Sequence, residues 1–209
     1  MVISAPLRIL IALVLVISLA FCAGCTAPPA SQVPVPTTNP AATGPPATAT
    51  ATTPPVATTA VYTSPAYGYT LTYPTSWAVR EENGGTTVVF TTAAESASDN
   101  FQENLKVVVQ DLSSAPMNLD AFISSQLEKK KQGLANYNPT HEENLKIGGY
   151  NARKLSYTGT LGSGLMRWVE IYTIRGLTAY TLTFTADESH YRFFVEDADK
   201  MLKSFAFTS

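Results

Sequence analysis

Tyr67-Gly68-Tyr69-Thr70-Leu71-Thr72-Tyr73-Pro74 is the stretch that indicates the fold most directly. Tyrosine and leucine occupy alternate positions, with glycine and threonine between them. A repeat of two is typical of a β-strand with one buried face, because successive side chains point to opposite faces of a sheet. We therefore expect a strand over 67–73 that ends at Pro74, a turn at Ser76, and a new strand from Trp77 to Val79.

Similar segments follow towards the C-terminus. Asn83-Gly84-Gly85 is a strong signal for a tight turn. Further strands are expected at 86–92, 104–111, 142–147, 151–158, 165–175 and 177–186. Because glycines punctuate the last four of these, they are predicted to form an antiparallel meander.

Two segments have the apolar spacing of helices that pack on a core. In the first, we expect Asn118 as the N-cap, Lys129–Lys131 in the last turn and Gly133 as the C-cap. The second is expected over 188–203, with Asp187 as its N-cap.

No strand–helix–strand repeat occurs, so the order of elements predicts an α+β fold in which helices sandwich an antiparallel β-sheet. We expect a single domain over 61–209, and about 149 residues suffice for a hydrophobic core. The whole chain carries 14 basic and 16 acidic residues. This balance argues against nucleic acid as a partner, which requires a basic surface.

Residues 1–24 have the composition of a secretory signal peptide. Arg8 precedes an apolar run that starts at Ile9, and the small residues Ala23 and Gly24 come directly before Cys25. This junction resembles a bacterial or archaeal lipobox. We expect cleavage after Gly24 and lipidation of Cys25, which would anchor the chain to the membrane on its extracytoplasmic side.

Three alternatives to this anchor stay open. Cleavage could occur without lipidation, or the leader could remain as a membrane helix, although 9–24 is shorter than the roughly 20 residues that span a bilayer. Cys22 is a second acceptor, but bulky Phe21 would then stand at the cleavage position. A redox role for the Cys22–Cys25 pair is disfavoured, because the pair lies within the signal sequence.

Residues 25–60 are expected to form a disordered linker after the lipidated cysteine. Thr26 to Ala60 contain ten threonines, nine prolines and nine alanines, without a charged residue. Such a segment has too few large apolar side chains to offset the entropy lost on folding. It should act as a spacer, and its composition also suits O-glycosylation.

Three motifs in the domain resemble one known family. They are Gly68-Tyr69-x-Leu71-x-Tyr73-Pro74-x-x-Trp77, Gly149-x-x-Ala152-x-x-Leu155-x-Tyr157 and Met201-Leu202-x-Ser204-Phe205. Together they resemble the PsbP-like domains, which include lipid-anchored prokaryotic proteins. The resemblance implies a PsbP/Mog1-like α/β/α sandwich. The founding members support photosystem II, but the shared motifs are structural, so that role does not follow.

The sequence contains no catalytic constellation that we can identify. His141 and His190 are the only histidines, and both are expected at the surface. Ser163 lies between two glycines, a context that favours a hairpin over a nucleophile elbow. Glu196, Asp197 and Asp199 fall on a helix, which cannot supply a calcium loop. No catalytic, cofactor-binding or metal-binding residue is therefore assigned, and no cofactor is expected.

We expect a non-catalytic, surface-tethered module that binds a protein or another component of the cell envelope. The alternative is a lipoprotein that binds a small ligand or a cation for a transporter or an envelope complex. A deep pocket lined by Trp168, Tyr180 and charged residues would favour this alternative. A hydrolase with dispersed acids is the third hypothesis, and two carboxyl groups facing each other across a cleft would favour it. The tyrosines are expected mainly in the core.

Overall fold

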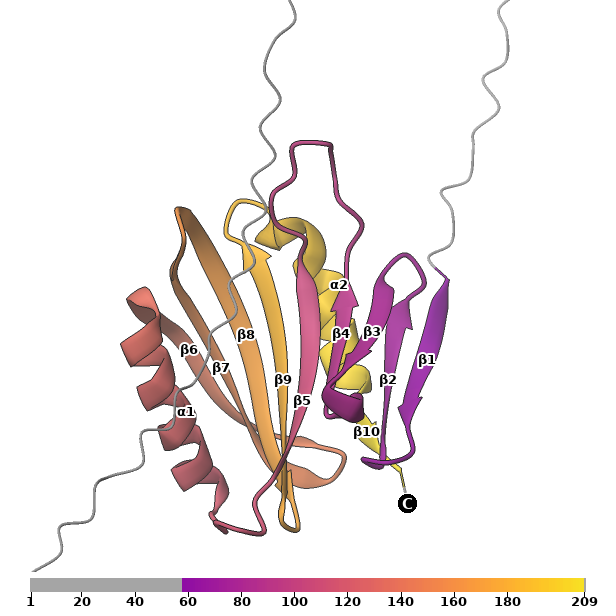
Figure 1. Cartoon of the computed structure of the whole chain (residues 1–209), viewed down its shortest axis with the longest axis vertical. Helices are drawn as coiled ribbons and strands as arrows, with labels where there is room; N and C mark the ends of the chain where they lie inside the picture. Colours follow the sequence, from indigo (N-terminus) through magenta and orange to yellow (C-terminus); the bar gives the residue numbers. More distant parts are fainter. Residues whose placement is uncertain (1–57, 209) are drawn as a thin grey trace, which may run out of the picture. The chain divides into compact units, whose positions relative to one another are not determined.

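The computed structural model describes residues 58–208, which form two antiparallel sheets and two α-helices (Figure 1). The smaller sheet has the order β1-β2-β10, with bounds Thr59–Ser64, Tyr69–Pro74 and Ala206–Phe207. The larger sheet has the order β3-β4-β5-β9-β8-β7-β6. Its strands in chain order are Ala78–Glu82 (β3), Thr87–Thr91 (β4), Asn104–Asp111 (β5), Ala135–Ile147 (β6), Tyr150–Leu161 (β7), Gly164–Arg175 (β8) and Thr178–Asp187 (β9).

The helices cover opposite faces of the larger sheet. On one face, α1 (Leu119–Gly133) buries Phe122 and Ile123 against Leu155 and Tyr172. On the other, α2 (Tyr191–Ser204) and the smaller sheet enclose the main core with the apolar residues of β4, β5, β8 and β9. The expected α+β sandwich is therefore confirmed.

Several predicted details also agree with the structure. The 3₁₀ turn η1 (Asn83–Gly85) connects β3 to β4, and β5 has the predicted limits. The side chain of Asn118 accepts a hydrogen bond from the backbone nitrogen of Ala121 at 2.9 Å, as expected of an N-cap. Tyr69, Tyr157, Tyr172 and Tyr180 are buried.

Other boundaries were wrong. The helix α2 starts at Tyr191, not at Glu188, because Asp187 accepts hydrogen bonds from Ser189 and closes a turn instead of capping the helix. The C-cap of α1 is Leu134, and Gly133 is still helical.

The strands were also incompletely predicted. Strand β6 starts at Ala135 and continues through Pro139, which is tolerated because β6 is an edge strand with register shifts on either side of Pro139. Strands β1 and β10 were not expected. Strand β1 includes Thr59 and Ala60, which the sequence pattern places in the linker.

Three connections meet at one end of the larger sheet, at the top of Figure 1: the β4–β5 loop, the β7–β8 hairpin and the β9–α2 turn. The backbone nitrogen of Glu188 donates to the carbonyl of Leu165 at 2.9 Å, which joins the last two. Neither helix of the described domain has the length and apolar character needed to cross a membrane.

Candidate functional site

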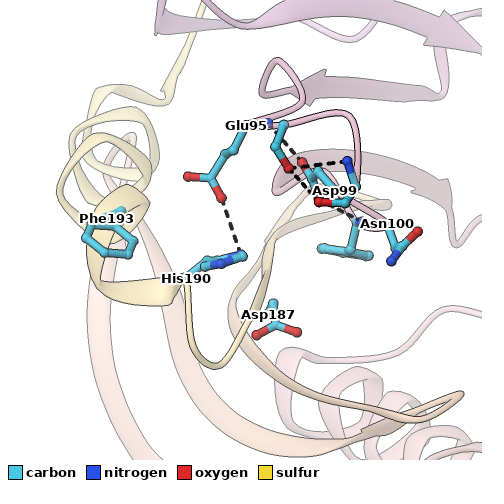
Figure 2. A pocket seen from close by; sticks show the side chains of 9 residues that line it. Glu95, Asp99, Asn100, Asp187, His190 and Phe193 are labelled. Atoms are coloured by element: carbon cyan, nitrogen blue, oxygen red, sulfur yellow. Dashed lines mark hydrogen bonds and ion pairs between the residues drawn. The ribbon is translucent and has the colours of Figure 1, made fainter. Parts of the chain in front are cut away.

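A cavity of about 510 Å³ opens at this end of the sheet, between the β4–β5 loop and the start of α2 (Figure 2). Its walls are mainly polar or charged, with two phenylalanines. The lining residues are Glu95, Ser96, Ser98, Asp99, Asn100, Phe101, Asp187, His190 and Phe193.

The β4–β5 loop is held in shape by its own side chains. The Asp99 carboxylate accepts from the backbone nitrogens of Glu95, at 3.1 Å, and Phe101, at 3.0 Å. Such local bonds are characteristic of short acidic side chains in loops, and here they fix the wall of the cavity.

His190 connects the loop to the helix. It is the residue before α2, and its Nδ1 lies 3.3 Å from Oε2 of Glu95 and 3.8 Å from Oε1 of Glu103. Figure 2 shows Glu95 extending from the loop towards the imidazole. An ion pair forms here when His190 is protonated.

Glu103 lies behind His190 and is fully buried. Neither oxygen of its carboxylate has a hydrogen-bond partner. Burial raises the pKa of Glu103, with a contribution from Glu95, while His190 and the nearby backbone nitrogens of Glu103 and Asp187 act in the opposite direction. An ionised carboxylate without hydrogen bonds is costly to bury, so burial favours the neutral, protonated form of Glu103.

The cavity is acidic. Glu95, Asp99 and Asp187 line it, and the hydrogen bonds from Ser189 lower the pKa of Asp187, which favours its charged form. His190 is the only basic residue among the lining residues. The arrangement can therefore bind a positively charged group.

The cavity does not show an arrangement for covalent catalysis. Within residues 58–208, no hydrogen bond joins a serine to a histidine, and no group of three or more histidine, cysteine or carboxylate side chains is arranged to hold a metal ion. A nucleophile would need such a base beside it.

The residues considered from sequence do not meet in one place. His190 lies in the cavity and is only partly exposed, but His141 is exposed on β6, with Nε2 3.7 Å from Oε2 of Glu143. Ser163 is in the exposed β7–β8 turn. Cys25 lies outside the described residues.

Two further sets of residues that the sequence suggested as sites also do not form a site. Trp168 and Tyr180 lie on opposite faces of the larger sheet, and therefore do not share a pocket. The acidic residues of α2 are engaged by lysines. Glu196 is 2.8 Å from Lys200, and Asp199 contacts Lys203.

A second polar cluster lies beneath α1, remote from the cavity. Glu170 of β8 is buried, and its carboxylate is 2.9 Å from Nζ of Lys130 and 3.1 Å from the hydroxyl of Thr183. Tyr172 also donates to it, and Lys130 lies over the ring of Tyr157 at 5.7 Å. Because Lys130, Tyr172 and Thr183 all donate to the buried carboxylate of Glu170, this cluster acts as a structural connection between α1 and the sheet.

Glu103, Glu95 and Asp99 were missed by the sequence analysis. Their spacing carries no recognised motif, and only the β4–β5 connection brings them to His190. Glu170 did give a signal, because it is a charged residue within the otherwise apolar segment from Trp168 to Tyr172.

Comparison with known proteins gives one family and several similar folds. The family model for PsbP matches residues 57–207. A search of curated proteins finds no match.

Among solved structures, the chain is similar to cyanobacterial PsbP (CyanoP) from Synechocystis sp. PCC 6803, with 19% identity, a TM-score of 0.55, and coverage of 73% of this chain and 94% of that one. It is similar to LpqN of Mycobacterium tuberculosis, a protein involved in cell envelope biogenesis, with 11% identity, a TM-score of 0.54, and coverage of 73% and 86%. PA94 from Pseudomonas aeruginosa, a protein of unknown function, has 14% identity, a TM-score of 0.51, and coverage of 70% and 94%.

These solved structures support the fold, and the resemblance of the three sequence motifs agrees with them. Since the family model covers nearly all of the described domain, the chain belongs to the PsbP family.

Proposed function

We propose that this protein is an extracytoplasmic, lipid-anchored PsbP-family module that binds a partner without catalysing a reaction. The lipid would be attached to Cys25, and residues 26–58 would hold the domain away from the membrane. Binding would use the end of the domain where the β4–β5 loop, the β7–β8 hairpin and the β9–α2 turn meet.

The acidic cavity carries this proposal. It is recessed, it places the unsatisfied carboxylate of Glu103 behind His190, and it has no paired nucleophile and base among the described residues. Binding sites are commonly recessed and contain a few polar groups that point towards one another. The lipobox-like junction and the similarity to LpqN support a place in the cell envelope.

The anchor is tested by fractionation and intact mass. The native protein should be recovered from membranes as a chain that begins at Cys25 with added lipid mass, and Cys25→Ser should release it. Cys22→Ser is the matched control, and it should remain in the membrane fraction. A Cys25→Ser chain that stays in membranes with its leader uncleaved would show that the anchor is a helix.

Partner binding is tested separately by photo-crosslinking in intact cells. A photoreactive residue at Ser98, on the cavity wall, should capture a specific envelope component. The same residue at Glu128, exposed on α1, should not. Equal capture from the two positions would contradict binding at the cavity.

A receptor for a small cationic molecule is the second candidate function. The carboxylates of Glu95, Asp99 and Asp187 in the cavity favour this function, because they attract any positively charged group, whether free or part of a larger molecule.

A further inference from the structure

The β4–β5 loop is fixed at its base but attached at its tip through a single ion pair. At the base, the backbone nitrogen of Thr92 donates to the carbonyl of Glu103 at 2.9 Å. Among the described residues, the polar contacts of segment 93–100 stay inside the loop, except that Glu95 pairs with His190. The position of the loop tip therefore depends on this one contact.

His190 itself is held in place by the β9–α2 turn. Its backbone nitrogen donates to the carbonyl of Asp187 at 3.1 Å, and its carbonyl accepts from the backbone nitrogen of Phe193 at 2.9 Å. The turn is in turn bonded to β8 through the carbonyl of Leu165. Because the histidine is fixed, a change in its contact with Glu95 is taken up by the loop.

Two different carboxyl groups face Nδ1 of His190. The side chain of Glu95 is 37% exposed, and its Oε2 is 3.3 Å away. Glu103 is fully buried, its Oε1 is 3.8 Å away, and burial raises its pKa, which favours the neutral form. A protonated imidazole donates to a carboxylate, whereas a neutral imidazole can accept the proton of a neutral carboxyl group. Each charge state of His190 therefore has a suitable partner.

The other acidic side chains around His190 are already engaged. The carboxylate of Asp187 accepts hydrogen bonds from the backbone nitrogen and the hydroxyl of Ser189, and these bonds keep it within the β9–α2 turn. Asp99 accepts from backbone nitrogens of the loop itself. Neither of them connects the loop to the helix, so Glu95 alone does so.

The basic side chains of the neighbouring elements are engaged as well. Arg167 of β8 makes two hydrogen bonds with Glu188, at 2.7 and 2.6 Å. On α2, the guanidinium of Arg192 lies over the ring of Phe193 at 4.6 Å. Glu95 pairs with His190 instead, whose charge changes with pH.

We propose that His190 is a pH-dependent latch on the β4–β5 loop. When its imidazole is protonated, it pairs with Glu95 and holds the loop against the start of α2. When the imidazole is neutral, it releases Glu95 and accepts a hydrogen bond from the protonated carboxyl group of Glu103. The proton lost from Nδ1 passes to water, and Glu103 keeps its own. The ordinary charge change of histidine falls between about pH 5 and 8, so the latch responds in this range.

The latch alters the cavity, because the loop forms most of its wall. Six of the nine lining residues belong to the loop, and the other three, Asp187, His190 and Phe193, belong to the β9–α2 turn and α2 (Figure 2). Release of Glu95 lets the loop move away from α2 and widens the cavity, whereas protonation of His190 narrows it. This inference does not depend on what the cavity binds or on the membrane anchor.

The test measures loop opening by limited proteolysis of the full chain, extracted in an uncharged detergent. Subtilisin is the protease, and mass spectrometry counts only the cuts within 93–101. When opening is fast relative to cleavage, the rate follows the population of the open form. A synthetic peptide of residues 91–104, with the same substitution where one is present, corrects for the pH dependence of the protease.

We expect the corrected rate to rise about threefold between about pH 5.5 and 7.5, because one partly exposed ion pair is lost. His190→Asn and Glu95→Gln should each be cut at the fast rate at both pH values. His141→Asn, the same substitution at an exposed histidine of β6, is the matched control and should keep the threefold rise. Circular dichroism of each variant checks that the fold is retained.

Glu103→Gln separates the latch from ionisation of Glu103. The glutamine cannot ionise, but its amide can donate to the neutral imidazole, so the rise should persist. Three outcomes would overturn the proposal: no rise in the wild type, an equal rise in His190→Asn or Glu95→Gln, or loss of the rise in Glu103→Gln. The last would show that Glu103, and not His190, is the group that titrates.

Discussion

Two buried carboxylates of this domain are in opposite environments. Glu170 is contacted by Lys130, Tyr172 and Thr183, whereas Glu103 lacks a hydrogen-bond partner. The first is a satisfied network that fixes α1 on the sheet. The second is buried beside His190, and burial raises its pKa, which favours its neutral form.

Replacing Lys130 by methionine should destabilise the domain by about 2 kcal/mol, because it leaves the charge of Glu170 buried without its cation. The value is below that for fully buried pairs, since the Lys130 side chain is 24% exposed. Urea denaturation measures the change. Lys129→Met, an exposed neighbour on α1, is the control and should cost less than about 0.5 kcal/mol. Equal losses for the two variants would contradict the role of the pair.

The raised pKa of Glu103 predicts a pH dependence of stability. The native state holds this proton more tightly than the unfolded state, so ionisation of Glu103 favours unfolding. This contribution to stability is present below the ordinary pKa of 4.5 and is lost as the pH rises through the raised native pKa.

Glu103→Gln cannot ionise, so its stability relative to the wild type should increase as the pH rises above 4.5. Denaturation curves at several pH values measure this difference. Glu128→Gln, at an exposed position, should show no comparable trend. A difference for Glu103→Gln that is constant with pH would contradict the assigned shift.

Among the elements, the β6–β7 hairpin shows how a turn positions a distant strand. Gly148 has a φ of +54°, and a Cβ at this position would lie 2.5 Å from the ring of Phe207 in β10. The ring of Phe207 packs against Tyr150 and Tyr180, so it has little freedom to move. The last strand therefore depends on the absence of a side chain at Gly148.

Gly148→Ala should lower the free energy of unfolding by about 3 kcal/mol, from backbone strain together with overpacking. Gly149→Ala is a close control, because Gly149 also has a positive φ, +86°, but no atom lies within 4 Å of the added Cβ. It should cost only about 1 kcal/mol, from strain alone. Thermal denaturation compares them, and similar losses would show that contact with Phe207 is unimportant.

At the scale of the whole domain, α2 connects the two sheets. Ser204 accepts from the backbone nitrogen of Thr72 at 2.9 Å, and Phe205 stacks on Tyr69 with ring centroids 5.1 Å apart. The sheets therefore share one core instead of forming separate units. This rigid body presents three connections at one end, which is a suitable arrangement for binding on a stable scaffold.

The fold was largely predictable because local patterns reflect burial. The alternation in 67–73 and the apolar spacing of both helices follow from which side chains must face the core. Strand β10 has only two residues, too few for a pattern, and it forms because β2 offers an unpaired edge. The start of α2 was misplaced because Asp187 bonds to Ser189 and not to the helix.

The sequence by itself determined the fold class, most of the strands, both helices and the family resemblance, since these depend on local periodicity and short motifs. Only the tertiary structure determined the candidate site. Glu95 and Glu103 lie near His190, which is 95 and 87 residues further along the chain, because β5 pairs with β9 and the β4–β5 loop leads into β5. That proximity arises from strand pairing, and no local sequence pattern encodes it.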